Sequence, residues 1–198
     1  MTDMTQLERM AAGLLYDPGD LALVAARRAA SDLCYAINVL PPSQVEERMS
    51  LFGRLFGAMG VDGHIEPSFH CDYGFHISTG ANFYANYNCV MLDCAPITFG
   101  DDVMIGPNCA FYTACHPLDP DERISGLEYA KPIRVGHRVW IGGNTVVNPG
   151  VTIGDHAVIG SGSVVTHDIP PGVVAVGNPC RVLRPITPAD RMVVPGHP

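Results

Sequence analysis

The stretch IRVGHRVWIGGNTVVNPGVTIGDHAVIGSGSVVTHDI, residues 133–169, decides the fold because its pattern repeats every six residues. Every sixth position is aliphatic, in the series Val135, Ile141, Val147, Ile153, Ile159 and Val165. The position four residues after each of these is small or aliphatic, and glycine directly follows four of the six. Neither the period of an α-helix nor that of an ordinary β-strand gives this spacing. A six-residue repeat is typical of a parallel β-helix.

In such a fold each repeat forms one short strand and one turn, and three repeats complete a triangular coil of about 18 residues. The aliphatic side chains should point into the coil, with the small residues near its corners. Glycine should follow them either because a side chain would clash with the next coil or because φ must be positive. Strands of successive coils then pair in parallel.

The same register continues upstream through Phe99, Ile105 and Phe111, and the interval from Phe111 to Val135 is again a multiple of six. Within it, residues 116–132 (HPLDPDERISGLEYAKP) are polar and contain three prolines, so we expect an excursion loop that leaves the coil and rejoins it. Before residue 97 the register is looser and slips by two residues ahead of Phe99, in the series Ile65, Cys71, Ile77, Phe83 and Cys89. We therefore assign the β-helix to residues 61–184.

Residues 1–60 show helical spacing instead, as in Leu7, Met10, Ala11 and Leu14. Asp20 is placed to cap a second helix, and Ser43 with Glu46 resembles a capping box that opens a third. Three short helices should cover one end of the coil, whose edge would otherwise promote aggregation. Residues 185–198, with four prolines, should form a loose tail.

Composition excludes several classes of function. The chain has a net charge of −8 and no run of Lys or Arg, which argues against a nucleic-acid partner. It has neither an apolar run long enough for a membrane span nor a leader at its start, so we expect no membrane association and a cytoplasmic location. Its seven cysteines include no C-x-x-C pair, which predicts reduced thiols and no structural zinc site.

Several motifs occur in a characteristic order. They are YDPGD at 16–20, CDYG at 71–74, NFYANYN at 82–88, His116-Pro117, GLEYAKPI at 126–133, VWIGG at 139–143 and GNPCRV at 177–182. This set resembles the galactoside/maltose O-acetyltransferase group of the hexapeptide acyltransferases. The resemblance implies a left-handed β-helix, a homotrimer with active sites between neighbouring subunits, acetyl-CoA as co-substrate and no required metal. The acceptor would be a sugar or a similar small molecule that carries a hydroxyl.

A hydroxyl is a weak nucleophile, so a base must remove its proton as it attacks the thioester, and imidazole suits that task near neutral pH. His116, where the chain leaves the coil, is the candidate base, although it could be a solvated loop histidine. Glu128, by side chain or main-chain carbonyl, is the candidate acceptor for its second ring nitrogen. By resemblance Asn86 positions the acceptor hydroxyl, unless it is a stacked turn residue, and the Gly143 N–H stabilises the oxyanion.

The resemblance also implies which residues bind the two substrates. Those expected to bind the acceptor are Asp17, Arg27, Asp72, Tyr84 and Asp93; of these, Asp17 and Arg27 could equally be ordinary helix-surface charges. Those expected to bind coenzyme A are Trp140, Gly143, Ser161, Thr166, His167, Arg181 and Arg184. His167 departs from relatives that usually carry Lys, and Cys94 stands where the galactoside enzyme has a carboxylate, which leaves the exact sugar open.

Two other functions compete with acetyl transfer. A non-catalytic hexapeptide-repeat scaffold would not need His116, Asn86 and Trp140 together. A zinc enzyme like carbonic anhydrase would need three converging histidines. His70 and His76 fall on successive faces of a coil, whereas His137 and His156 are almost one coil apart without an obvious third ligand.

Overall fold

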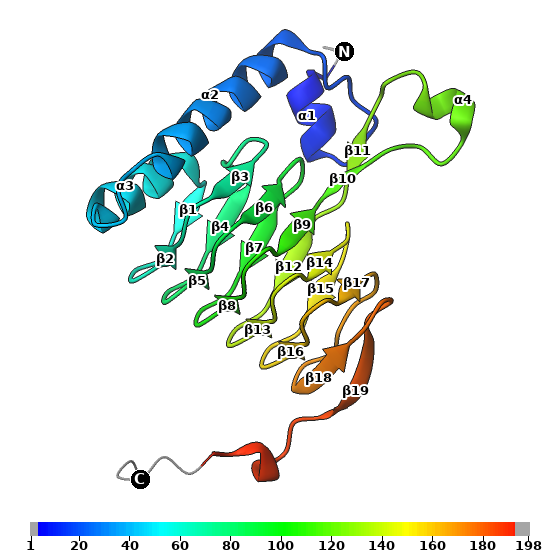
Figure 1. Ribbon diagram of the computed structural model, residues 1–198. Helices are drawn as coiled ribbons and strands as arrows, with labels where there is room; N and C mark the ends of the chain where they lie inside the picture. The colour runs from blue at the N-terminus through cyan, green and yellow to red at the C-terminus, as the bar shows by residue number, and fades with distance from the viewer. Residues whose placement is uncertain (1–3, 193–198) are drawn as a thin grey trace.

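The computed structural model describes residues 4–192 and consists of a stack of short parallel strands with helices across one end (Figure 1). The helices are α1 (Gln6–Ala11), α2 (Leu21–Asn38), α3 (Val45–Leu55), the short α4 (Pro120–Arg123) and a 3₁₀ turn, η1 (Pro188–Asp190). No helix among the described residues is long and apolar enough to cross a membrane.

Three parallel sheets form the walls of the coil. The first contains β1 (Ala58–Met59), β4 (Ile77–Thr79), β7 (Ile97–Phe99), β12 (Ile133–Val135) and β15 (Thr152–Ile153). The second contains β2 (His64–Ile65), β5 (Tyr84–Ala85), β8 (Met104–Ile105), β13 (Trp140–Ile141), β16 (Val158–Ile159), β18 (Val173–Val176) and the antiparallel β19 (Arg181–Pro185). The third contains β3 (Phe69–Cys71), β6 (Cys89–Leu92), β9 (Ala110–Tyr112), β14 (Val146–Val147) and β17 (Val164–Val165).

The predicted core of the repeat is confirmed. All six side chains of the series that starts at Val135 are buried, and those 18 residues apart are paired, as Ile141 is with Ile159. The buried hydroxyls of Thr145 and Ser163 donate to the carbonyls of Gly142 and Gly160 over 2.7 and 2.5 Å. The interior therefore holds no unpaired hydroxyl at these two corner positions.

The glycines of the repeat are required by close approach of the next coil. A Cβ on Gly142 would lie 2.6 Å from the backbone nitrogen of Ser161, and one on Gly154 would lie 2.6 Å from that of Pro171. Positive φ falls two residues later, at Asn144 (58°) and His156 (61°). Of the two reasons considered for glycine, steric contact is the one that applies here.

The register upstream of residue 97 differs from the expected one. Cys71 pairs with Met91, and Thr79 pairs with Phe99. Along the chain, successive inward-facing positions are six residues apart in a regular repeat. Here the interval is eight residues, from 71 to 79 and again from 91 to 99. The sequence predicted one shift of the register before Phe99. The structure instead has two insertions of two residues each, in successive coils and at the same corner. Ile77, Phe83 and Cys89 are buried, but at the small-residue positions of their coils.

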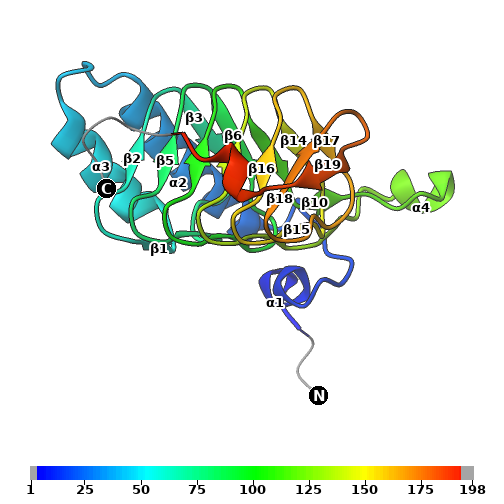
Figure 2. The same ribbon diagram turned by 90° about the horizontal axis from the view of Figure 1, so that it is seen from below.

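The excursion arises from this same corner, between β9 and β12. Its arms, β10 (Ala114–Cys115) and β11 (Tyr129–Ala130), pair antiparallel, so it leaves the coil slightly before residue 116. Its tip carries α4, which Asp119 caps, and projects away from the stack (Figure 2). We call the segments 71–79, 91–99 and 111–135 together the inserted corner, and residues 133–169 the regular coils.

The N-terminal helices follow the prediction only in part. Asp20 accepts hydrogen bonds from the backbone of Ala22 and Leu23, which confirms it as the cap of α2. The expected capping box of Ser43 and Glu46 is wrong, because α3 starts after Gln44 and has no side-chain cap.

The arrangement of the helices also differs from the expected one. The α2 and α3 helices contribute to the core cluster of the coil, whereas α1 belongs to a second cluster beside the inserted corner. Strand β1 already lies inside the segment assigned to helices. Of the expected tail, residues 186–192 include the turn η1, and residues 193–198 lie outside the described part.

Candidate active site

A pocket of about 490 Å³ opens at the inserted corner. It is lined by the turn before α2, by α2 itself, by both two-residue insertions and by the arms of the excursion. Its lining residues are Pro18, Gly19, Arg27, Asp72, Tyr73, Leu92, Cys94, Ala114, His116 and Glu128. Four residues predicted from the sequence, His116, Glu128, Arg27 and Asp72, therefore lie together, although they are far apart in the chain.

His116 faces Glu128 across this pocket. The imidazole is 54% exposed, and its Nε2 lies 3.9 Å from Oε1 of Glu128, the distance of an ion pair when the ring is protonated. The main-chain carbonyl of Glu128 instead accepts the N–H of Tyr16 over 2.9 Å. Of the two alternatives, the carboxylate of Glu128 is therefore the part that is turned towards His116.

Arg27 extends from α2 into the pocket wall. Its guanidinium donates to the hydroxyl of Tyr73 over 2.7 Å and to the carbonyl of Pro18 over 2.6 Å. Burial raises the pKa of Tyr73 to about 12, although the hydrogen bond from Arg27 opposes the shift. Of the two roles considered for Arg27, lining the pocket is the one that the structure supports.

Asp72 and Cys94 meet on another wall. The Cys94 thiol donates to Oδ2 of Asp72 over 3.4 Å. Burial raises the pKa of Asp72, while this hydrogen bond and the charge of Arg27 oppose the rise. Burial, followed by the charge of Asp72, raises the pKa of the Cys94 thiol. Cys94 is therefore a neutral donor, and the carboxylate on this wall belongs to Asp72.

Asp93 does not line the pocket, which corrects its expected role in binding the acceptor. Its side chain is fully buried, and its two oxygens accept the backbone N–H groups of Asp72 (3.1 Å), Tyr73 (2.8 Å) and His76 (3.3 Å). Its main-chain carbonyl contacts Nδ1 of His76 at 2.8 Å. Burial raises the pKa of Asp93, opposed by the backbone hydrogen bonds. Asp93 belongs to the segment 91–99, and its hydrogen bonds fix the backbone of the neighbouring segment 71–79.

Three further predicted residues lie outside this pocket. Oδ1 of Asp17 accepts the N–H of Gly19 and so holds the turn before α2. Tyr84 belongs to the second sheet, where its ring stacks on His64 at a centroid distance of 6.0 Å. Asn86, just beyond it, accepts the N–H of Tyr87 with its own side-chain oxygen. Within one chain, neither Tyr84 nor Asn86 joins His116.

The residues expected to bind coenzyme A lie on the regular coils and the last strands. Trp140 projects from the second sheet and is 53% exposed, and Gly143 follows at the next turn. One coil further on, the N–H of Gly162, next to Ser161, donates to the carbonyl of Gly143 over 2.9 Å.

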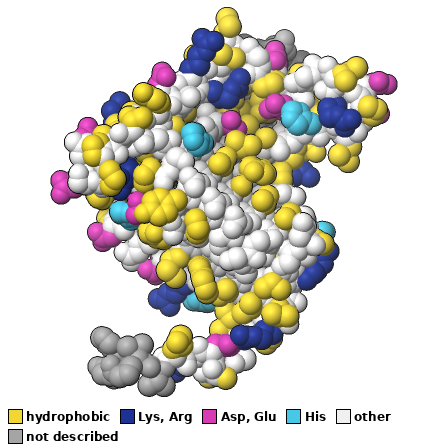
Figure 3. Space-filling view, in the orientation of Figure 1, with side chains coloured by type: hydrophobic (Ala, Val, Ile, Leu, Met, Phe, Trp, Pro, Cys, Tyr) yellow, Lys and Arg dark blue, Asp and Glu magenta, His cyan; other side chains and the backbone are white. Residues whose placement is uncertain are grey.

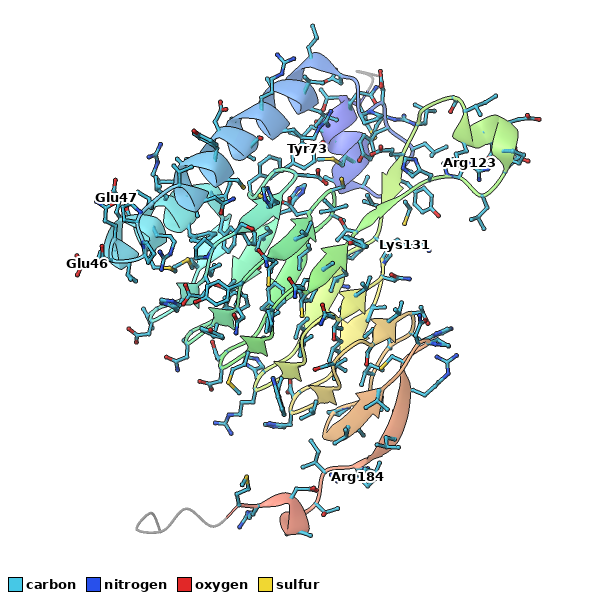
Figure 4. The ribbon with its side chains drawn as sticks, viewed as in Figure 1. Glu46, Glu47, Tyr73, Arg123, Lys131 and Arg184 are labelled. Carbon is cyan, nitrogen blue, oxygen red and sulfur yellow. The ribbon has the colours of Figure 1, made fainter. Side chains whose placement is uncertain are left out.

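A shallow groove of about 280 Å³ lies near the last strands, lined by His167, Asp168, Ile169, Cys180, Arg181 and Val182. Nδ1 of His167 lies 2.8 Å from the hydroxyl of Thr166. The guanidinium of Arg184 binds both oxygens of Asp190, at 2.7 and 2.8 Å, which lowers the pKa of Asp190 to about 2. Arg184 is thus engaged by a carboxylate in this structure. Figure 4 shows it at the opposite end of the molecule from Tyr73.

On the face in Figure 3, charged side chains are most frequent on the helices and the excursion, whereas the middle of the coil is mostly uncharged. The zinc alternative required three converging histidines. Within residues 4–192 no group of three His, Cys, Asp or Glu side chains is placed to hold a metal ion.

Comparison with known proteins gives a consistent result. The maltose acetyltransferase hexapeptide capping motif matches residues 9–60, and the bacterial transferase hexapeptide (six repeats) matches residues 132–167. The galactoside O-acetyltransferase of Escherichia coli is 44% identical over 96% of this chain and 93% of its own.

Two solved structures match equally well. A maltose O-acetyltransferase from Clostridium difficile has a TM-score of 0.92 and 47% identity, covering 93% of this chain and 98% of its own. A galactoside acetyltransferase in complex with coenzyme A has a TM-score of 0.92 and 44% identity, covering 95% and 94%. The chain therefore belongs to the galactoside/maltose O-acetyltransferase group of the hexapeptide-repeat acyltransferases, acetyl-CoA-dependent enzymes with a left-handed β-helix.

Proposed function

We propose that the protein transfers an acetyl group from acetyl-CoA directly to a hydroxyl of a sugar or a similar small acceptor, with His116 as general base. The observation that carries the proposal is the single pocket that His116 and Glu128 line together with Arg27 and Asp72. These charged groups provide donors and acceptors for the other hydroxyls of a sugar. The names of the relatives, galactoside and maltose O-acetyltransferases, support the same class of acceptor.

In the proposed reaction the acceptor oxygen attacks the thioester carbonyl while His116 takes its proton. The carbon–sulfur bond then breaks, and the proton passes from the imidazolium to the coenzyme A sulfur, which leaves as the free thiol. The carboxylate of Glu128, 3.9 Å away, stabilises the imidazolium between these steps.

The oxyanion of the intermediate needs a preorganised donor, and such a donor contributes roughly 2.7–4 kcal/mol where measured. The N–H groups of Gly142 and Asn144 donate to carbonyls of neighbouring coils, at Ile159 and Pro107, over 2.8 Å. The N–H of Gly143, between them, has no acceptor among residues 4–192. This availability supports Gly143 as the oxyanion donor.

Coenzyme A would bind along the regular coils, against Trp140 and past Ser161 and Thr166, with its phosphates near His167 and Arg181. A relative of the same fold has been solved with coenzyme A bound. Arg184 can bind a phosphate only if it leaves Asp190, since its guanidinium now binds that carboxylate.

We further propose a homotrimer in which a neighbouring copy brings Tyr84 and Asn86 to the pocket of His116. Both residues lie on the second sheet, away from His116 of their own chain. Outward-facing side chains of this sheet, Tyr84, Met104 and Trp140, follow one another in register, and the latter two are 52% and 53% exposed. Such an apolar row suits a contact between subunits.

The first test is acetyl-CoA-dependent release of free thiol with galactosides, glucose, maltose, chitooligosaccharides and hydroxylated antibiotics. Release with at least one hydroxyl acceptor is expected; none with any of them would favour the scaffold alternative. Mass spectrometry during turnover should find no acetyl group on any cysteine, because transfer is direct.

The second test mixes two inactive variants in one oligomer. His116→Ala and Asn86→Ala chains, each inactive alone, should regain part of the activity when they are unfolded and reassembled together. No recovery in mixed oligomers would contradict a site shared between copies.

A further inference from the structure

Tyr16, in the turn between α1 and α2, forms three hydrogen bonds with Glu128. Its hydroxyl donates to Oε2 of the carboxylate over 3.0 Å. Its backbone N–H donates to the carbonyl of Glu128 over 2.9 Å, and the N–H of Glu128 donates back over 3.0 Å. Tyr16 is only 1% exposed. The N-terminal segment is thereby tied to the returning arm of the excursion, at the residue that faces His116.

We propose that Tyr16 is a positioning residue for acetyl transfer, whose hydroxyl fixes the Glu128 carboxylate so that its other oxygen faces His116. This inference rests on the proposed role of His116 as base. A glutamate side chain has three rotatable bonds, and holding it in one geometry costs conformational entropy that a fixed partner reduces. With Oε2 held by the phenol, Oε1 is left to stabilise the imidazolium.

No other group in the pocket does this task. Arg27 is bound to Tyr73 and the carbonyl of Pro18, and the Cys94 thiol donates to Asp72. Among residues 4–192, the Tyr16 hydroxyl is the hydrogen-bond donor to the Glu128 carboxylate. Burial raises the pKa of Tyr16, so the phenol stays protonated and remains a donor.

The test is steady-state transfer from acetyl-CoA to p-nitrophenyl β-galactoside by the full chain. Tyr16→Phe keeps the buried ring and both backbone hydrogen bonds and removes only the hydroxyl. It should lower kcat roughly tenfold, in line with a lost hydrogen bond to a charged group. The KM for acetyl-CoA and the stoichiometry of coenzyme A binding should not change. A merely structural defect would instead lower the fraction of chains that bind.

A double-mutant cycle makes the inference specific. In a Glu128→Gln background, Tyr16→Phe should lower kcat less than twofold, because the carboxylate it would orient has gone. Thr5→Ala is the matched control: it breaks the capping box of α1 and leaves the Tyr16 hydroxyl in place, so kcat should stay within twofold of wild type.

Two results would overturn the inference while sparing the proposed function: a Tyr16→Phe enzyme within twofold of wild-type kcat, or an undiminished loss in the Glu128→Gln background. If His116→Ala retained its activity in the same assay, the base itself would be misassigned and the inference would fall with it.

Discussion

The regular coils and the inserted corner are built from the same repeat, but they differ in the spacing of their inward-facing residues and in whether a pocket forms. In the regular coils each inward residue follows the last by six, and partners such as Val147 and Val165 are paired one coil apart. At the inserted corner the steps are eight, eight and twenty-four residues, and the Arg27–His116 pocket opens there. Regular repetition builds the stack, and the candidate site lies where the six-residue spacing is interrupted three times at the same corner.

The two regions are also held together differently. The regular coils are stabilised by buried aliphatic side chains. The corner also has buried apolar side chains, but it depends in addition on buried polar groups that satisfy backbone donors and acceptors. Thr113, for example, donates to the carbonyl of Leu92 over 2.6 Å and accepts the N–H of Ala95 over 2.9 Å. Substitutions should therefore affect the two regions by different mechanisms.

The largest effect is expected in the regular coils. Ile153→Asp would bury an unpaired charge in the stack and should abolish folding, since its cost of several kcal/mol approaches the whole stability of a domain. Arg134→Asp is the control, because its side chain on the neighbouring β12 is exposed. Circular dichroism should show parallel β-structure for the control alone; a folded Ile153→Asp protein would refute the inward register.

An intermediate effect is expected at the corner. Asp93→Ala would leave three backbone N–H groups without an acceptor and should lower the free energy of unfolding by about 2–4 kcal/mol. Urea unfolding measures this change. The matched control is Asp101→Ala. The Asp101 carboxylate accepts the N–H of Ala81 at an exposed turn, so this substitution should lower the free energy of unfolding by less than about 1 kcal/mol. Equal losses would mean that the inserted corner does not depend on its buried carboxylate.

The smallest effect is expected in the groove near the last strands. If His167 approaches a coenzyme A phosphate, His167→Lys supplies a full charge and should tighten binding at pH 8 by about 1 kcal/mol, roughly fivefold in Kd. Calorimetric titration with coenzyme A measures the change. Identical Kd values for the two proteins would mean that His167 points away from the phosphates and that other cations hold them.

The sequence predicted the regular coils well because every coil there needs an aliphatic residue at the same inward position, so the pattern recurs every six residues. It predicted the presence of irregularity near residues 89–99, but not that two insertions share one corner, since residues such as Ile77 and Phe83 are buried in either register. The capping box at Ser43 failed because a local motif did not determine where α3 begins.

For the site, the family resemblance pointed to His116, Glu128, Arg27 and Asp72 as candidates without showing that they lie together. Asp93 was misread because a buried carboxylate that accepts backbone N–H groups has no sequence signal to distinguish it from a ligand-binding one. Tyr16 and Tyr73 lie inside the YDPGD and CDYG motifs, and these motifs were the available signal for both. Their contacts across the chain, with Glu128 and Arg27, could come only from the structure.

The most direct test of this account is His116→Ala measured for both substrates at once. If the base lies at the inserted corner and the regular coils bind the cofactor, kcat should fall roughly 10²–10⁴-fold, the usual contribution of a positioned general base. The Kd of coenzyme A, measured by calorimetry on the same preparation, should remain within twofold. A variant that keeps more than half of the wild-type kcat would remove His116 from the mechanism and contradict the account.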